Sequence, residues 1–297
     1  MGTHDRCCNY YLIKTFSERL YGTLAFNRGW NFYYRRHVRQ RWDCWSFKRK
    51  MEALRIENLT KDFGGLRAIN GISFSIKEEK RIAIIGPNGA GKTTLFNLIS
   101  GNMLSSSGKI YLYSKELTKL PPHERATLGL SRTFQVTNLF FNLSALDNVL
   151  LAKLGQSASK FNMTQKLALM KGFVDESEQL LAVWKLKEKE HHLVKHLAHG
   201  EQRKLEVILG LASKPKILLL DEPTAGLGKD ETNLLINSIR ELLKDIIVLM
   251  IEHDMQVAFN IAERIIVLHH GQIIADGKPD EVRMSPGVRE AYLGIPV

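Results

Sequence analysis

The feature that most constrains the fold is a glycine-rich stretch between an apolar run and a helix-like segment. Residues 86–94 read Gly-Pro-Asn-Gly-Ala-Gly-Lys-Thr-Thr, which fits the pattern G-x-x-x-x-G-K-[ST]. Residues 81–85 are rich in isoleucine, as in a short buried strand, and residues 95–100 continue as a helix that Gly101 stops. A strand before this pattern and a helix after it predict a phosphate-binding loop rather than an ordinary glycine-rich turn.

The residue types of this loop suit a nucleoside triphosphate. Its three glycines permit backbone turns that a Cβ would obstruct, so that successive N–H groups face an anion, and the following helix adds its positive dipole end. We expect Lys92 to reach the β- and γ-phosphates, Thr93 to place its hydroxyl on Mg²⁺ and Thr94 to donate to the α-phosphate. The predicted nucleotide-binding residues of the loop are Gly86, Pro87, Asn88, Gly89, Ala90, Gly91, Lys92, Thr93 and Thr94.

Two further apolar runs end in polar residues that suit phosphate chemistry. Residues 216–223 read Lys-Ile-Leu-Leu-Leu-Asp-Glu-Pro, and residues 246–251 form another apolar run shortly before His253. Unbroken runs are typical of parallel strands buried on both faces, and open α/β sheets bind ligands at the carboxyl ends of such strands. Asp221 suits the Mg²⁺ shell, Glu222 suits the polarisation of a water that attacks the γ-phosphate, and His253 can hydrogen-bond that phosphate.

Other segments predict antiparallel pairing. Alternating apolar and polar side chains indicate a small antiparallel sheet beside the nucleotide at residues 54–59, 72–76 and 109–113. Phe63 falls in the loop between the first two of these strands, where it either stacks on adenine or packs in the core. Residues 265–268 and 272–275 predict a closing hairpin joined through Gly271.

The segment between the phosphate loop and Asp221 contains helical patterns. Residues 143–154 predict a helix with Ser144 as its N-cap, residues 159–196 a less regular amphipathic helix, and residues 203–211 a further helix. Four histidines lie near the end of the less regular helix. They have no carboxylate or cysteine shell, so a solvated helix end explains them better than a metal site does: His191, His192, His196 and His199.

The first fifty residues differ in composition from the rest. The chain has 297 residues and a net charge of +11, and residues 1–50 carry eleven Lys and Arg against three acidic residues, together with all three cysteines. Scarce serine and scattered aromatics argue against a transit peptide or a membrane-surface arm. We expect an upstream extension before a start at Met51, or a disordered tail. The cysteine usage favours a reducing setting, and no apolar run is long enough to span a membrane.

These blocks, in this order, resemble the ATP-binding subunit of ABC transporters, over about residues 53–297. The resemblance implies an α/β fold, with a P-loop NTPase core of the ABC ATPase type, an antiparallel β subdomain and a helical signature subdomain at about residues 136–214. Residues 51–297 would form the ABC ATPase domain, and residues 1–50 an extension that is disordered or not native.

The resemblance also implies roles at matching positions. Phe63 resembles the aromatic that stacks on adenine, and Gln135 the glutamine that senses Mg²⁺ and touches the membrane partner. Residues 197–202 occupy the ABC signature, which would bind the ATP of an opposing subunit through Ala198, His199, Gly200 and Glu201. Catalysis would then rest on Lys92, Gln135, Glu222 and His253, and Mg²⁺ binding on Thr93, Gln135 and Asp221.

Within that family, three segments look most like the branched-chain amino acid importer branch: residues 132–135, 252–255 and 291–294. Lipopolysaccharide-export and urea-uptake ATPases are similar enough to remain alternatives. Two positions depart from the usual pattern. Ala198 replaces a serine whose hydroxyl would bond the γ-phosphate of the opposing subunit, and a bond of that kind is worth roughly 1.5–3 kcal/mol, which predicts weaker nucleotide-driven dimerisation. Gly228 stands where many members carry Asp, which puts communication across the dimer in doubt.

The resemblance predicts an ATPase that uses ATP and Mg²⁺ to import branched-chain or related amino acids. Its expected partners are integral-membrane permease subunits, a second ABC ATPase subunit, identical or different, and indirectly a substrate-binding protein. Its expected location is the cytoplasmic face of the inner (plasma) membrane. A soluble nucleic-acid-associated ABC ATPase is the alternative, which the net charge favours, but the charge lies in residues 1–50, and no nucleic acid is expected. A non-hydrolysing assembly subunit fits poorly with intact Lys92, Asp221, Glu222 and His253.

Overall fold

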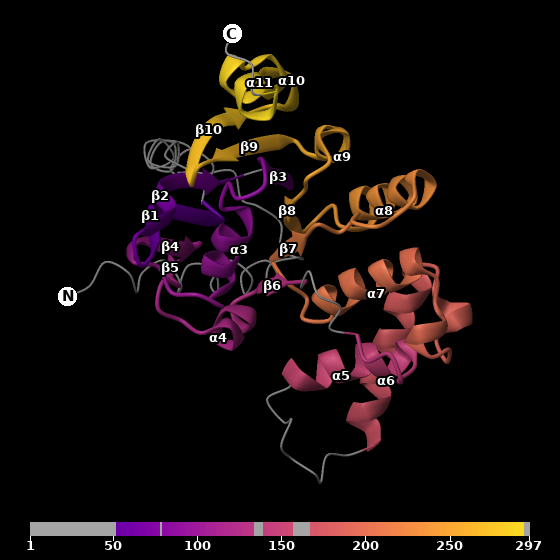
Figure 1. Ribbon diagram of the computed structural model, residues 1–297. Helices are drawn as coiled ribbons and strands as arrows, with labels where there is room; N and C mark the ends of the chain where they lie inside the picture. The colour runs from indigo at the N-terminus through magenta and orange to yellow at the C-terminus, as the bar shows by residue number, and fades with distance from the viewer. Residues whose placement is uncertain (1–51, 78, 134–138, 157–166, 294–297) are drawn as a thin grey trace, which may run out of the picture. The chain divides into compact units, whose positions relative to one another are not determined.

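The computed structural model describes residues 52–77, 79–133, 139–156 and 167–293 (Figure 1). The chain divides into two units, Met1–Lys50 and Met51–Val297, and all the described residues belong to the second.

A six-stranded sheet is the centre of this unit. Its strand order is β10 (Gln272–Gly277), β9 (Arg264–His269), β3 (Arg81–Ile85), β8 (Ile247–Ile251), β7 (Ile217–Asp221) and β6 (Leu130–Arg132). All neighbouring strands pair in parallel except β9 and β10, which form the predicted antiparallel hairpin. Every residue of β3, β7 and β8 is buried, which is why these strands are apolar except for Arg81 at the start of β3 and Asp221 at the end of β7.

The side chains of the large sheet alternate between two hydrophobic cores. On β3, Ile82 and Ile84 pack in the core that contains α3 and the antiparallel sheet. Ala83 and Ile85 pack in the opposite core, which contains the helices that follow β6 in the chain. Both faces of the sheet are therefore covered by apolar side chains. Polar residues can lie at the carboxyl edge of its strands, where open α/β sheets bind ligands.

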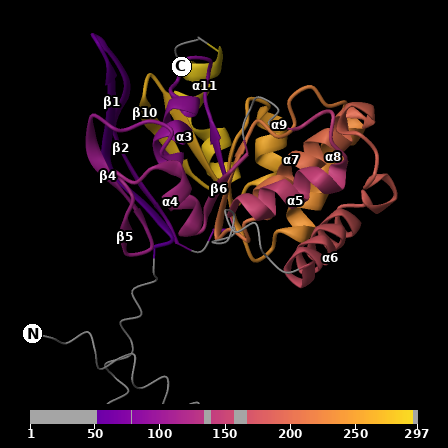
Figure 2. The same cartoon turned by 90° about the horizontal axis from the view of Figure 1, so that it is seen from below.

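The second sheet is antiparallel, as the alternating segments predict, and it has four strands where three were predicted. Its order is β2 (Leu66–Ile76), β1 (Leu54–Phe63), β4 (Ser107–Leu112) and β5 (Lys115–Glu116). Figure 2 shows these strands on one side of α3 and α4, and α5 to α8 on the other side.

The helices include several that the sequence patterns did not single out. The described helices are α3 (Lys92–Ser100), α4 (Pro122–Thr127), α5 (Ala145–Gln156), α6 (Leu167–Val183), α7 (His199–Leu211), α8 (Lys229–Leu242), α9 (Met255–Ile261), α10 (Pro279–Met284) and α11 (Pro286–Leu293). Ser144 caps α5 as predicted, because its Oγ accepts the N–H of Asp147 at 3.0 Å.

The single helix predicted over residues 159–196 is wrong in its C-terminal half. The helix α6 ends at Val183, and two short 3₁₀ turns, Lys187–Lys189 and Val194–His196, complete the connection. Trp184 is buried and Lys185 has a φ of +59°, so the chain turns there to place the apolar side chain in the core.

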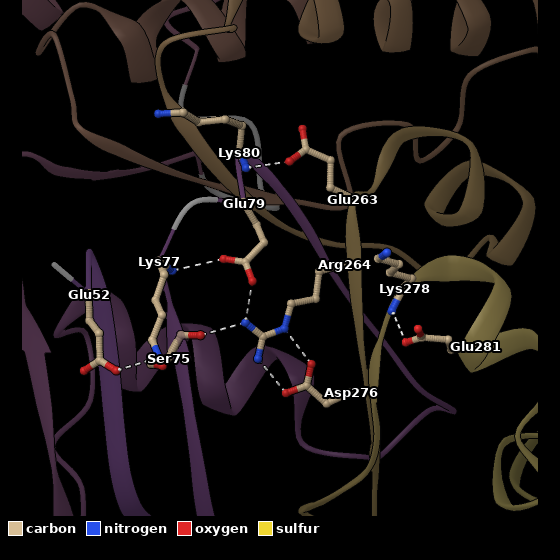
Figure 3. Close-up of polar contacts among 10 residues, drawn as sticks. All are labelled: Glu52, Ser75, Lys77, Glu79, Lys80, Glu263, Arg264, Asp276, Lys278 and Glu281. Atoms are coloured by element: carbon tan, nitrogen blue, oxygen red, sulfur yellow. Dashed lines mark hydrogen bonds and ion pairs between the residues drawn. The ribbon is translucent and has the colours of Figure 1, made fainter. Parts of the chain in front are cut away.

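An arginine on β9 joins the two sheets (Figure 3). The Arg264 guanidinium donates to both carboxylate oxygens of Asp276 on β10, at 2.6 and 2.7 Å. It also donates to the carbonyl of Ser75 on β2 at 2.7 Å and to Glu79 at 3.1 Å. The antiparallel sheet is thereby held against the end of the large sheet.

None of the helices in the described parts of the chain is long and apolar enough to cross a membrane.

Candidate functional site

Three strand ends meet at the carboxyl edge of the large sheet. Ile84 of β3 pairs with Ile251 of β8, which pairs in turn with Asp221 of β7. The segments that follow these strands therefore leave the sheet at one level, where open α/β sheets bind ligands. This register brings the phosphate loop, Glu222 and His253 to the same edge.

The backbone of the phosphate loop passes so close to its neighbours that only glycine fits at two positions. A Cβ on Gly86 would lie 2.2 Å from the carbonyl oxygen of Leu268 on β9. Gly91 has a φ of +100°, and a Cβ there would lie 2.7 Å from the carbonyl oxygen of Ala68 on β2. Strands β2 and β9 thus fix the position of the loop from outside.

Lys92, the first residue of α3, folds back over this loop. Its Nζ donates to the carbonyl oxygen of Gly86 at 2.7 Å and to that of Pro87 at 3.1 Å. Burial lowers the pKa of Lys92, and the carboxylates of Glu222 and Asp221 act in the opposite direction without reversing the shift. The structure therefore places a buried amine at the loop, with two carboxylates close enough to influence it.

Among the described residues, one carboxylate oxygen of Asp221 has a hydrogen-bond donor and the other has none. Its side chain is fully buried, and Oδ2 accepts a hydrogen bond from Nη2 of Arg132 at 2.7 Å. Within the described residues, Oδ1 accepts no hydrogen bond. A buried carboxylate oxygen without a donor is unfavourable in a folded protein and suits a hard cation. Together with the exposed Thr93 in the first turn of α3, this residue set fits Mg²⁺.

Glu222 follows Asp221 with an unusual backbone. Its φ is +47°, a conformation that costs a non-glycine residue about 1–2 kcal/mol. The strain is held by the sheet, because the Glu222 N–H donates to the carbonyl of Ile251 at 3.0 Å. Strained residues of this kind cluster at functional sites. His253, exposed after the end of β8, is the third polar side chain at this edge.

The sequence patterns assign no role to Glu252, whose carboxylate is buried. Its side chain is fully buried directly after β8, and Thr224 Oγ1 lies 3.1 Å from each of its carboxylate oxygens. Burial raises the pKa of Glu252 to about 7, and the charges of Glu222 and Asp254 add to the shift. A carboxylate immediately after a fully apolar run is the signal that could have found it.

Phe63 is the last residue of β1 rather than part of a loop. Its side chain is 45% exposed, so the structure does not place the ring in the core. Lys61 holds its Nζ 5.2 Å from the ring centroid. The ring therefore remains open to a planar ligand.

Residues 199–202 of the predicted signature form the first turn of α7, and Ala198 is its N-cap. This helix begins at His199, one turn earlier than the predicted start at Arg203. Glu201 accepts a hydrogen bond from the Ala198 N–H at 3.0 Å and pairs with Lys189 at 2.7 Å. This is half of a capping box, because alanine has no oxygen to complete it. Burial raises the pKa of Glu201, but these two contacts outweigh it and the net shift is downward.

The signature contacts the segment after β7 rather than the phosphate loop of its own chain. The His199 ring packs on Gly226, where a Cβ would lie 3.0 Å from Cε1, and Gly200 packs against Glu231 of α8. The helices α3 and α7 also contribute to different cores, on opposite faces of the large sheet. Figures 1 and 2 show them on opposite sides of β6.

The C-terminal helix approaches the phosphate loop. Tyr292 of α11 places its phenol near the backbone of Gly86, and burial raises the pKa of Tyr292 to about 12. No sequence pattern connects this residue with the loop, which lies about two hundred residues earlier in the chain.

Two further predictions concern other parts of the chain. Gln135 lies outside the described residues. His191 is exposed, with its Nε2 3.4 Å from Glu190, and His196 lies in the second 3₁₀ turn. Over the described ranges there is no group of three or more His, Cys, Asp or Glu side chains that could hold a metal ion.

A family model described as ABC transporter matches residues 69–225, more than half of the chain. The chain belongs to the ABC transporter family. The match contains the phosphate loop, the predicted signature and the carboxylates of Asp221 and Glu222 at the end of β7. As an ATP-binding subunit of this family, the chain is an ATPase. A second model, described as branched-chain amino acid ATP-binding cassette transporter, matches residues 272–296.

Several curated ABC proteins are similar over most of their length. The high-affinity branched-chain amino acid transport ATP-binding protein BraF of Pseudomonas aeruginosa is 38% identical over 248 residues, which cover 81% of this chain and 97% of BraF. LivG of Salmonella typhimurium, which carries the same description, has the same identity and coverage. The probable LivG of Methanocaldococcus jannaschii is 34% identical over 82% of this chain and 98% of that protein.

Solved ABC cassettes share the fold. The ADP conformation of MJ1267, an ATP-binding cassette of an ABC transporter, has a TM-score of 0.71 and 30% identity, covering 82% of this chain and all of that chain. The dimeric structure of MJ0796, a bacterial ABC transporter cassette, has a TM-score of 0.65 and 25% identity over 76% of this chain and 98% of that one. The predicted P-loop ABC ATPase fold is therefore confirmed.

Proposed function

We propose that this ABC ATPase powers the import of branched-chain or related amino acids. The observation that carries the proposal is the match of residues 272–296 to the branched-chain model, which lies outside the general ATPase match. The names of BraF and LivG agree with it. The matched segment includes β10, α10 and Tyr292, so the part of the chain typical of this branch reaches the phosphate loop.

The proposed binding of ATP follows from the residues at the carboxyl edge. Backbone N–H groups of residue 86 and residues 88–91, together with the amine of Lys92, face the β- and γ-phosphates. Thr94 donates to the α-phosphate, and Phe63 stacks on adenine. Thr93, Asp221 and Gln135 would hold Mg²⁺, which supplies positive charge to the phosphate oxygens when bound.

The proposed hydrolysis uses Glu222 and His253. Glu222 accepts a proton from water while the water oxygen forms a bond to the γ-phosphorus, and the bond from that phosphorus to the bridging oxygen breaks. ADP and inorganic phosphate are the products. His253 hydrogen-bonds the γ-phosphate and holds it in line with the water. The fixed, strained backbone of Glu222 supports this role, because it sets the carboxylate before the reaction begins.

The proposed working unit is a dimer. Because α3 and α7 pack on opposite faces of the sheet, residues Ala198–Glu201 would complete the site of a second ATPase subunit. The solved dimer of the MJ0796 cassette shows that a related fold dimerises. Closure of the dimer on ATP and its reopening after hydrolysis would move two permease subunits that contact the chain near Gln135. These permeases would hold the chain at the cytoplasmic face of the inner membrane. A substrate-binding protein would deliver the amino acid to the permeases.

The ATPase assignment of Glu222 is tested with Glu222→Gln in the purified chain. We expect steady-state ATP hydrolysis to be lost while ATP binding persists and an ATP-dependent dimer accumulates in size-exclusion chromatography. Glu241→Gln, the same change at an exposed position on α8, is the matched control and should keep normal turnover. Hydrolysis at the parental rate in Glu222→Gln would remove Glu222 as the general base.

The cargo is tested by uptake of radiolabelled leucine, isoleucine and valine. Cells lacking this chain should lose high-affinity uptake of at least one of these amino acids, and the intact chain should restore it. Lys92→Ala should not restore it, because the phosphate loop would lose its amine. Normal uptake of all three in the deletion strain would contradict the proposed cargo while leaving the ATPase activity untouched.

A further inference from the structure

Arg132, at the end of the edge strand β6, connects the phosphate-loop helix with Asp221. Its Nη1 donates to Asn97 Oδ1 at 2.6 Å and to Ser100 Oγ at 3.0 Å, both on α3. Its Nη2 donates to Asp221 Oδ2 at 2.7 Å. The guanidinium also lies 5.6 Å from the ring centroid of Phe96, on the same helix. The Arg132 side chain thus links its own strand β6 with the strand β7 and with the helix α3, which packs on the sheet.

This connection is buried and geometrically specific. The Arg132 side chain is 7% exposed and that of Asp221 is not exposed at all, so the pair is screened little by solvent. A guanidinium is planar and presents its donors in a fixed fork, whereas a lysine amine is a compact charge without that geometry. The contacts to Asn97 and Ser100 therefore fix the plane in which Arg132 meets the carboxylate.

We propose that Arg132 is a positioning residue for the metal site, which holds Asp221 by Oδ2 and so presents the unpartnered Oδ1 to Mg²⁺. The inference rests on the proposed role of Asp221 as a metal ligand. Because Arg132 also binds α3, it sets Asp221 relative to the helix that carries Thr93, the other proposed ligand on a described element. Groups that orient a metal ligand typically contribute 10–100-fold to metal affinity.

The decisive variant is Arg132→Lys, because it keeps the positive charge beside Asp221 and removes only the fork. Binding of a fluorescent ATP analogue to the purified full chain is measured in EDTA and over a series of Mg²⁺ concentrations. We expect the Mg²⁺ concentration for half-maximal effect to rise about tenfold, while the affinity in EDTA changes by less than about threefold. Asn97→Ala should shift the Mg²⁺ dependence in the same direction by a smaller factor.

Arg125→Lys is the matched control. Arg125 is also a buried arginine that donates to α3, at 2.7 Å to the carbonyl oxygens of Leu98 and Ile99, but within the described residues its hydrogen bonds go to backbone carbonyls and not to a carboxylate. We expect it to lower the thermal midpoint at least as much as Arg132→Lys does, with an unchanged Mg²⁺ dependence. A purely structural role for Arg132 would make the two variants behave alike.

Asp221→Asn separates the inference from the proposed function. The positioning role of Arg132 is overturned if Asp221→Asn weakens the Mg²⁺ dependence and Arg132→Lys does not. It is also overturned if Arg132→Lys weakens nucleotide binding equally with and without Mg²⁺. In both cases the proposed role of Asp221 as a metal ligand is kept. If Asp221→Asn also leaves the Mg²⁺ dependence unchanged, both the inference and the proposed metal role of Asp221 are overturned.

Discussion

The hydroxyl of Thr224 lies 3.1 Å from both carboxylate oxygens of the fully buried Glu252. Thr224 follows Glu222 by two residues, and Glu252 precedes His253. The contact therefore fastens the segment that carries one proposed catalytic residue to the segment that carries the other. Burial, with the charges of Glu222 and Asp254, raises the pKa of Glu252 to about 7, although the Thr224 hydrogen bonds act against the shift.

This raised pKa predicts that Glu252 weakens the fold as pH rises through neutrality. Between its ordinary pKa of 4.5 and about 7, the folded protein keeps a proton that the unfolded chain releases, so stability falls with rising pH and levels off above about 7. Glu252→Gln removes this titration and can keep a hydrogen bond with Thr224. We expect the variant to gain stability relative to the parent from pH 5 to pH 8, by on the order of 3 kcal/mol at most. Urea unfolding at several pH values measures it.

Glu176→Gln gives the opposite trend and serves as the control. Hydrogen bonds from Lys153 and Lys214 lower the pKa of Glu176, so its stabilising effect is present at neutral pH and lost as pH falls through the lowered pKa. The Glu176→Gln variant should be less stable than the parent at neutral pH and equal to it in acid. A pH-independent difference for Glu252→Gln would contradict the buried, protonated carboxylate.

Ala198 stands at the N-cap of α7, and we expect a serine hydroxyl there to raise stability and to promote ATP-dependent dimerisation. Ala198 has the extended dihedrals of an N-cap, with φ −61° and ψ 154°, and Glu201 already provides half of a capping box. Ala198→Ser completes the box by accepting the Glu201 N–H, and caps of this kind stabilise by about 1 kcal/mol. The thermal midpoint should rise by about 2–4 °C. The ATP concentration needed for dimerisation should fall, because the hydroxyl can also donate to the γ-phosphate of the partner.

Lys278→Ser is the matched control for this effect. Lys278 occupies the N-cap position of α10, and Glu281 accepts its N–H at 3.0 Å in the same half-box arrangement. This variant should gain thermal stability without any change in ATP-dependent dimerisation. If both variants promote the dimer equally, general stabilisation explains the result and the contribution of Ala198 to the second site is refuted.

The elements that the sequence predicted well are those whose patterns are local. β8 is apolar at every position and β7 at every position before Asp221, because both faces are covered, and the hairpin of β9 and β10 carries a glycine at its turn. The helix α3 was equally evident, because it begins after the glycine-rich loop and ends at Gly101. In each case the residue types of a few adjacent positions are enough to determine whether a strand, a turn or a helix forms.

The contacts that shape the candidate site depend on residues far apart in the chain. β6 has only three residues and no period to detect, yet it places Arg132 beside Asp221, 89 residues later. Glu252 looks like a surface carboxylate until Thr224 is brought to it by the pairing of β7 with β8. The long helix predicted to residue 196 failed for the same reason, because the burial of Trp184 overrides local periodicity.

Two glycines of the phosphate loop, Gly86 and Gly89, have different physical requirements. Gly86 faces the carbonyl oxygen of Leu268, which a Cβ would approach to 2.2 Å, whereas a Cβ on Gly89 would meet no atom within 4 Å. Gly89 requires glycine only for its φ of +79°. We expect Gly89→Ala to cost about 1–2 kcal/mol and Gly86→Ala about 3 kcal/mol, because the latter also forces the loop away from β9.

Urea unfolding of the two variants checks this order. Gly86→Ala should in addition lose ATP binding, since the loop and β9 can no longer keep their separation. If Gly86→Ala does not accumulate as a folded protein while Gly89→Ala does, the order is also supported. Equal losses of stability in two folded variants would contradict it.

The arginine that joins the two sheets, Arg264, forms a partly buried ion pair. Arg264 holds Asp276 with two hydrogen bonds, donates to Ser75 and Glu79 as well, and has a side chain only 19% exposed (Figure 3). Arg67 makes a similar two-bond pair with Asp62, at 2.8 and 3.4 Å, but its side chain is 57% exposed. Solvent screening and side-chain entropy remove most of the benefit of an exposed pair, whereas a partly buried fork keeps it.

We therefore expect Arg264→Lys to lower the free energy of unfolding by about 2 kcal/mol, because a lysine cannot reproduce the fork and its hydrogen bonds to charged groups. Arg67→Lys should leave the urea midpoint unchanged. High salt should barely alter the loss at Arg264, since its pair is shielded from the solvent that screens exposed charges. If the two substitutions cost the same, or if salt abolishes the loss at Arg264, the guanidinium does not hold the antiparallel sheet against the large sheet.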